Sequence, residues 1–138
     1  MMVNLSHENV RESLPAAVLF VLGLMDLLRG FLHTFRVNWA ARTFAKLDLS
    51  AARQDQLMLL GAFGISNFLT GVLFLLIATM APAMAAWVLL AILGAYLLGA
   101  IGLKVSGVKR EAAFKGRSFM MGYLLVCLIT FVVSRVIH

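Results

Sequence analysis

Charged residues are scarce in this chain of 138 residues. Lys, Arg, Asp and Glu together make up 13% of it, whereas hydrophobic residues make up 62%. Soluble domains carry about a quarter charged residues, so this balance argues against an ordinary soluble domain and is typical of a protein in a lipid bilayer. Each helical crossing needs about 20 apolar residues, and four crossings nearly use up the length. We therefore expect one membrane domain over residues 1–138.

Cysteine and catalytic motifs are also rare or missing. The single cysteine, Cys127, excludes an internal disulfide, a CxxC redox pair and a zinc site built from cysteines. The sequence contains no dinucleotide-binding, phosphate-binding or metalloprotease motif, and its three histidines are too scattered for a bis-histidine haem site. No nucleophile with an acid–base pair can be assembled. We therefore expect no catalytic residues, no metal site and no enzyme, and the sequence names no cofactor.

Long apolar runs are what the sequence has in excess. Four of them are long enough to span a bilayer, and we interpret all four as helices because backbone polar groups in hydrocarbon must be satisfied internally. The predicted fold is all-α, an antiparallel four-transmembrane-helix bundle. A very short turn at Pro82 should make the second and third spans pack side by side. The spans cover about residues 14–35, 57–80, 84–103 and 118–135.

The twelve Lys and Arg residues predict the orientation of these spans. Four lie between the first two spans and five between the last two, whereas the opposite side carries only Arg11, Arg135 and the uncharged turn MAPAM. The positive-inside rule then places both basic segments in the cytoplasm and both termini outside it, in a cell inner or plasma membrane. Because these charges flank spans and no nucleic-acid motif is present, the expected partner is the lipid bilayer and not nucleic acid.

The first basic segment has a pattern of its own. In RVNWAARTFAKLDLSAARQDQ, the apolar residues Trp39, Phe44 and Leu47 recur at helical spacing with basic residues among them. This pattern predicts a short amphipathic cytoplasmic helix after span one, lying at the membrane interface. Docking of a partner is the alternative interpretation.

The first span contains charge. Its stretch GLMDLLRGFLHTF carries Asp26, Arg29 and His33 at positions i, i+3 and i+7, which lie on one face of a helix. An unpaired charge near the bilayer centre costs about 2.5 to 3.5 kcal/mol. The Arg29 side chain leans toward the helix N-terminus and therefore toward Asp26. We expect these two residues to pair, to face the bundle interior and to contact Asn67 or Tyr96.

The other spans offer polar side chains at a similar depth. Together with the first span they define the candidate ligand-binding residues Asp26, Arg29, His33, Asn67, Tyr96 and Thr130. A plainer interpretation is that the charges neutralise each other, that the amide and hydroxyl groups make interhelical hydrogen bonds, and that His33 lies at the headgroups.

Two functions fit these observations. The first is a small polytopic membrane protein with a midplane polar site that binds or transports a small molecule, a lipid-like molecule, a proton or an ion. A chain this small would then form a homo-oligomer to build an access pathway. The alternative is an accessory or assembly subunit of a larger membrane complex, in which the polar residues are structural.

Overall fold

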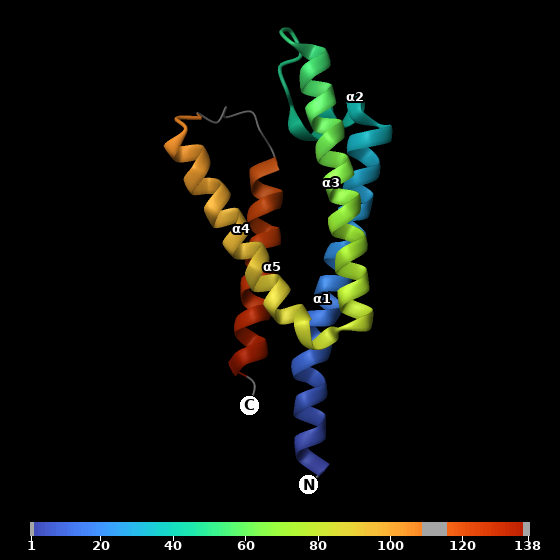
Figure 1. The fold of residues 1–138 in the computed structure, drawn as a ribbon, viewed down its shortest axis with the longest axis vertical. Coiled ribbons are helices and arrows are strands. Elements are labelled where there is room, and N and C mark those ends of the chain that lie inside the picture. Colours follow the sequence, from blue (N-terminus) through green and yellow to red (C-terminus); the bar gives the residue numbers. More distant parts are fainter. Residues whose placement is uncertain (1, 109–115, 137–138) are drawn as a thin grey trace.

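We analysed a computed structural model in which the backbone is described for residues 2–108 and 116–136, and the side chains for residues 12–108 and 118–136. Within these residues the chain is helical and contains no strand (Figure 1). The elements are α1 (Met2–Phe35), α2 (Val37–Ala40), the π-helix η1 (Ala41–Ala45), α3 (Arg53–Met80), the 3-10 helix η2 (Pro82–Met84), α4 (Ala85–Val105) and α5 (Gly116–Val136).

Four helical segments are long and apolar enough to cross a membrane, as the apolar runs predicted. They are Glu12–Phe35, Arg53–Met80, Pro82–Val105 and Ser118–Val136. The largest differences from the predicted bounds are at the starts of α1 and α3, where helix continues into polar sequence. A helix can continue beyond an apolar run, because polar residues also form the backbone hydrogen bonds of a helix. Asp55 in the first turn of α3 also suits the positive end of the helix dipole.

The connection after α1 contains the predicted short helix, built as α2 followed by η1. Its two alanines at the junction, Ala40 and Ala41, are fully buried, while the aromatic rings of Trp39 and Phe44 meet edge to face at 5.1 Å and are about half exposed. An exposed aromatic pair fits a helix lying at a membrane interface. That location stays a prediction.

Helix α1 is the central element and contacts the other three long helices. Helix α1 packs against α3, and α4 packs against α5. The two pairs meet near η2 and diverge toward the opposite end (Figure 1). The prediction that the second and third spans pack side by side is therefore wrong: within the described residues, α3 and α4 do not pack along their lengths. A short turn brings helix ends together but does not decide which faces fit.

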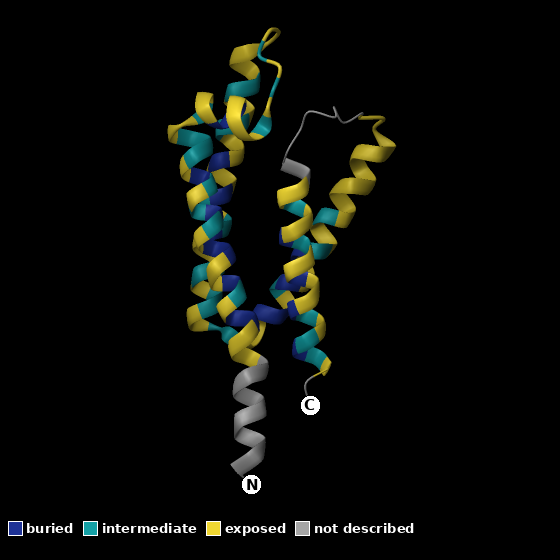
Figure 2. Ribbon diagram, turned by 180° about the vertical axis from the view of Figure 1, so that it is seen from behind, coloured by how far each residue is buried: buried dark blue, intermediate teal, exposed yellow. Residues whose placement is uncertain are grey.

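The hydrophobic core lies where the two pairs meet. Leu19 of α1, Leu89 of α4 and Cys127 of α5 are fully buried there (Figure 2). The small residues Ala16 and Ala85 belong to the same core and let the helices come close. Away from it, many large apolar side chains of all four long helices are exposed, which is the pattern of helices whose outer faces contact lipid.

Helices α1 and α4 end, and α3 and α5 begin, at the same end of the molecule (Figure 1). The beginning of α1 and the end of α5 lie at the other end (Figure 1). This arrangement matches an even number of crossings. Which end faces the cytoplasm stays a prediction from the charge count.

Candidate functional site

The contact between α1 and α3 is built on two glycine pairs, which we call the glycine seam. Gly23 faces Gly71 and Gly30 faces Gly64. A Cβ atom added at Gly71 would lie 2.9 Å from the carbonyl oxygen of Gly23, and one added at Gly30 would lie 3.0 Å from that of Gly64. The pairs are seven residues apart on each helix and so share one face. At both points the backbones approach too closely for a larger residue without movement.

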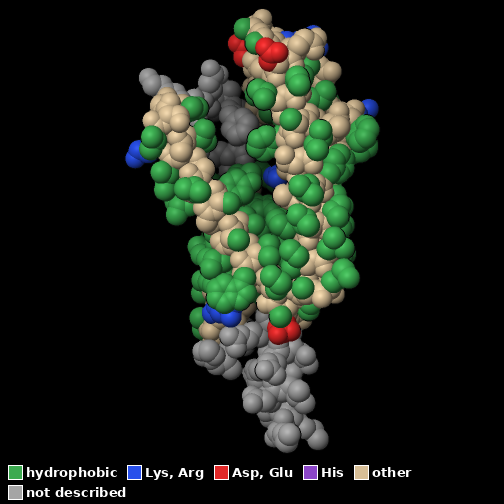
Figure 3. All heavy atoms as spheres, in the orientation of Figure 1, with side chains coloured by type: hydrophobic (Ala, Val, Ile, Leu, Met, Phe, Trp, Pro, Cys, Tyr) green, Lys and Arg blue, Asp and Glu red, His purple; other side chains and the backbone are tan. Residues whose placement is uncertain are grey.

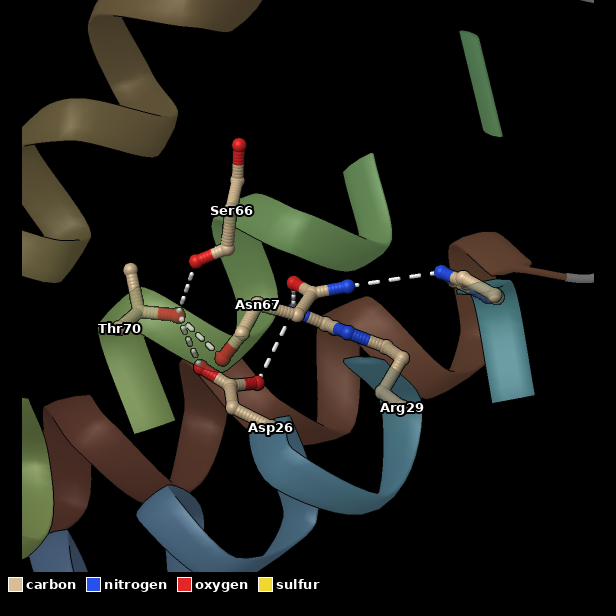
Figure 4. A network of polar contacts seen from close by, with 6 residues as sticks. Asp26, Arg29, Ser66, Asn67 and Thr70 are labelled. Carbon is tan, nitrogen blue, oxygen red and sulfur yellow. Dashed lines mark hydrogen bonds and ion pairs between the residues drawn. The ribbon is translucent and has the colours of Figure 1, made fainter. Parts of the chain in front are cut away.

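Polar side chains lie between the two glycine pairs and just beyond Gly30, and they meet across the seam. Asp26, Arg29 and His33 come from α1, and Asn67 and Thr70 come from α3; we call these five residues the polar cluster (Figure 4). Three or four residues separate neighbours on each helix, so the polar side chains of each helix project from one side of it. The close approach of the two backbones therefore brings short side chains within hydrogen-bonding distance.

Arg29 is the centre of the polar cluster. Its Nη2 atom lies 2.9 Å from Oδ1 of Asp26 and donates a hydrogen bond of 2.8 Å to Oδ1 of Asn67 (Figure 4). The second oxygen of Asp26 accepts a hydrogen bond of 3.2 Å from the Thr70 hydroxyl. The Asn67 amide nitrogen lies 3.4 Å from Nδ1 of His33. A chain of contacts thus connects five side chains of two helices.

The carboxylate and the guanidinium are satisfied to different degrees. Asp26 is 3% exposed, and both of its oxygens have a partner. Arg29 makes its two contacts through one nitrogen only, its Nε is buried without a partner, and 21% of its side chain is exposed. A guanidinium has five N–H donors, so the polar cluster has hydrogen-bond donors to spare. Chemically, it is suited to a group that accepts hydrogen bonds.

Four of the six candidate residues, Asp26, Arg29, His33 and Asn67, belong to this network. The expected ion pair and its contact with Asn67 are present. Tyr96 instead packs at the edge of the hydrophobic core, and Thr130 is buried on α5. Neither has a hydrogen bond to the polar cluster among the described residues. Whether any of the six binds a ligand stays a prediction.

Two residues join the site that the candidate set lacked. Thr70 lies three residues after Asn67, on the same helix face, and this spacing was the available signal. Tyr123 of α5 is buried and lines the apolar pocket between α1 and α5. Its position near the start of the fourth span gave no such signal, because the approach of α5 to α1 depends on the whole fold.

An open apolar groove of about 500 Å³ runs between α1 and α5. Val18, Leu22 and Met25 line its α1 wall, and Tyr123 belongs to its α5 wall. The spacing of the three α1 residues continues to Arg29, at i, i+4, i+7 and i+11, so Arg29 follows one turn after Met25 on the helix stripe that lines the groove. We call this feature the α1–α5 groove. On the face of the molecule where α3 and α4 lie in front, the surface is also hollowed between the two helix pairs (Figure 3).

Metal binding and homology give no further guide to the site. Among the side chains of residues 12–108 and 118–136, no group of three or more His, Cys, Asp or Glu is placed to hold a metal ion. No family model, curated protein or solved structure matches this chain. The chemistry of the polar cluster and the α1–α5 groove is therefore the guide to function.

Proposed function

We propose that this chain is an integral membrane protein that crosses the bilayer four times, with both termini outside the cytoplasm. Support comes from the four long apolar helices and the large apolar side chains exposed on each of them. The clustering of basic residues in the connections at one end supports the orientation. The polar cluster then lies inside the membrane, at a distance from both interfaces.

We further propose that the protein binds a small amphiphilic molecule. The head of this molecule, a carboxylate or phosphate, contacts Arg29, and its apolar part lies in the α1–α5 groove. The observation that carries the proposal is Arg29, whose side chain is partly exposed, whose contacts use Nη2 alone, and whose position on α1 continues the helix stripe that lines the groove. Acceptors with charge make strong hydrogen bonds to a guanidinium, because the donor and the acceptor are both ionised.

Each member of the polar cluster has a distinct role in this proposal. Asp26 and Asn67 both hold Nη2 of Arg29, and so they position the guanidinium and leave its other donors for the ligand. His33 contacts the Asn67 amide and orients it. Thr70 occupies the second oxygen of Asp26, which keeps that oxygen from turning toward a ligand head.

Two glycine variants test the groove with matched chemistry. Gly122 lines the α1–α5 groove, whereas Gly99 is on α4, and a Cβ atom added at either position would meet nothing within 4 Å. A Cβ atom therefore fits at both, and at Gly122 the rest of a leucine side chain would take up space in the groove. The full chain, purified in mild detergent, is analysed by mass spectrometry for bound amphiphiles. We expect Gly122→Leu to lower ligand retention about tenfold, since a discrimination of this size is typical for one or two methylenes in an apolar site, and Gly99→Leu to retain it.

Arg29→Lys tests the head contact in the same assay. Lysine keeps the charge but cannot offer the planar set of donors, so retention should fall while the protein still folds. Equal retention by the wild type, Gly122→Leu and Arg29→Lys would contradict the proposal. A wild-type preparation free of any stoichiometric amphiphile would contradict it as well.

An accessory subunit of a larger membrane complex is the second candidate. It is favoured by α4, where Gly94, Gly99 and Gly102 have open space beside them. Small residues on membrane helices commonly mark close contacts with another helix. Co-purification with a stoichiometric larger complex that Gly99→Leu disrupts would support this candidate, and the polar cluster would then be structural.

A further inference from the structure

The end of the molecule that holds the Pro82 turn carries another arginine, which, unlike Arg29, has no carboxylate partner among the described side chains. The guanidinium carbon of Arg135, in the last turn of α5, lies 4.3 Å from the ring centroid of Trp87 and 5.5 Å from that of Phe131. Its Nε is buried and has no hydrogen-bond partner. Proximity to the negative end of the α5 dipole explains a basic residue here. It does not explain stacking on two aromatic rings, which fixes the plane of the guanidinium.

A polar pocket of about 240 Å³ lies beside this arginine, where α1, the η2 turn and α5 meet. Glu12, Pro82, Trp87, Ser134 and Arg135 are among its lining residues. The η2 turn and the first turn of α4 form one wall, and the beginning of a long helix such as α4 carries a positive partial charge that favours anions. We call this site the Arg135 pocket. Its volume suits a small polar group better than a whole drug-sized molecule.

The two charges in the Arg135 pocket do not neutralise each other. Glu12 and Arg135 both line it, yet the one ion pair among the side chains of residues 12–108 and 118–136 is between Arg29 and Asp26. A simple anion would contact Arg135 but would also face the Glu12 carboxylate. A simple cation would contact Glu12 but would also face the Arg135 guanidinium. A zwitterion carrying an anionic and a cationic group a few bonds apart satisfies both charges.

We propose that the Arg135 pocket binds the zwitterionic head group of a membrane phospholipid, with the phosphate on Arg135 and the ammonium group on Glu12. The location favours a lipid over a soluble molecule. The pocket lies at the ends of the apolar helices, and the half-exposed Trp87 beside it is the kind of residue enriched where membrane and water meet. The proposal uses the membrane location proposed above but is independent of the polar cluster and the α1–α5 groove.

The experiment compares two lipids with identical acyl chains. The full chain in detergent micelles is titrated with phosphatidylethanolamine, which has an ammonium group, or with phosphatidylglycerol, which lacks one, and bound lipid is counted by native mass spectrometry. The wild type should retain phosphatidylethanolamine in preference. Glu12→Gln should remove this preference. Arg135→Gln should lower the retention of both lipids about tenfold, because a charge-assisted contact to the phosphate is lost.

Two controls keep the result specific. Arg53→Gln removes an exposed arginine at the other end of the molecule, whose hydrogen bond goes to Asn38, and should leave retention unchanged. Gly122→Leu should likewise leave it unchanged, because the groove is a separate site. Arg135→Lys keeps the charge and should restore part of the retention if Arg135→Gln acts through the phosphate.

The possible outcomes separate the proposals. Equal binding of the two lipids by the wild type, or no effect of Arg135→Gln, would overturn the Arg135 pocket alone. Free phosphoethanolamine binding as tightly as the lipid would overturn the choice of a lipid ligand. Failure of the full chain to float with vesicles of phosphatidylethanolamine and phosphatidylglycerol would overturn membrane residence itself.

Discussion

Asp26 is a buried carboxylate on an apolar helix, and its surroundings explain how the fold accommodates it. One oxygen contacts Arg29 a turn away, and the other accepts a hydrogen bond from Thr70 of the neighbouring helix. A charge buried in this way is stable only while its partners remain, because desolvation has already removed its water. The same reasoning applies to Arg29, which leans toward Asp26 as the sequence predicted. The Arg29 side chain, however, is partly exposed.

The ion pair predicts non-additive mutations. Asp26→Ala and Arg29→Ala should each lower the free energy of unfolding by about 3 to 5 kcal/mol, because each leaves the other charge without its partner. The double variant should be less damaged than the sum of the two. Thermal unfolding in detergent measures the three effects. If stability returns in the double variant while bound amphiphile stays lost, the pair forms a ligand site; purely additive losses would contradict an energetic unit.

Thr70 and Thr79 offer a matched pair of hydroxyls on α3. Both bond to carbonyl oxygens of their own helix, but only the Thr70 hydroxyl also reaches α1, at Asp26. Thr70→Val should therefore destabilise the α1–α3 contact by about 0.6 kcal/mol, the average for interhelical hydrogen bonds in membranes. Thr79→Val should have no measurable effect. Equal effects in an unfolding titration would mean that the bond to Asp26 contributes nothing.

Whole helices were more predictable from the sequence than their partners. A span must be apolar along its length whatever its neighbours are, so the apolar runs predicted the four long helices. Partner choice depends on matching faces. Gly23 and Gly30 have the same seven-residue spacing as Gly64 and Gly71, and this match is the sequence signal for pairing α1 with α3. The short Pro82 turn instead indicated α4 as the partner of α3, because a short turn shows only that two helix ends are close.

The glycine seam predicts opposite effects of alanine at two positions of α3. In Gly71→Ala the new Cβ would lie 2.9 Å from the Gly23 carbonyl oxygen, so the backbones must separate, at a cost of about 1 to 3 kcal/mol. At Gly61 nothing lies within 4 Å, and alanine should stabilise the helix by up to about 1 kcal/mol. Unfolding measurements on both variants decide the matter. A neutral Gly71→Ala would contradict the close approach.

The whole molecule consists of two helix pairs joined at one end, and this shape explains which candidate residues meet. Asn67 is on α3 and faces α1, so it joins the polar cluster. Tyr96 is on α4, which diverges from α3, and it packs at the edge of the hydrophobic core. Depth along a span can be counted from the sequence. The rotation of each helix about its axis and the angle between pairs cannot, because both are set by packing against other helices.

Topology is the last prediction and concerns the whole chain. Ala45 and Ser106 lie in or near the two connections at one end, and Ala83 is exposed in the turn at the other. The native Cys127 is fully buried and can be replaced by alanine to give a cysteine-free background. In intact cells, an impermeant thiol reagent should label Ala83→Cys but neither Ala45→Cys nor Ser106→Cys. Inverted membrane vesicles should give the reverse pattern.

Two contrary results would have different meanings. If Ala45→Cys and Ser106→Cys reacted from opposite sides, an odd number of crossings would separate them, and the four-span arrangement itself would be wrong. If all three sites exchanged sides together, the fold would stand and only the orientation would be reversed. The second result would mean that the basic residues of the two connections do not set the orientation, although short connections with such an excess normally remain in the cytoplasm.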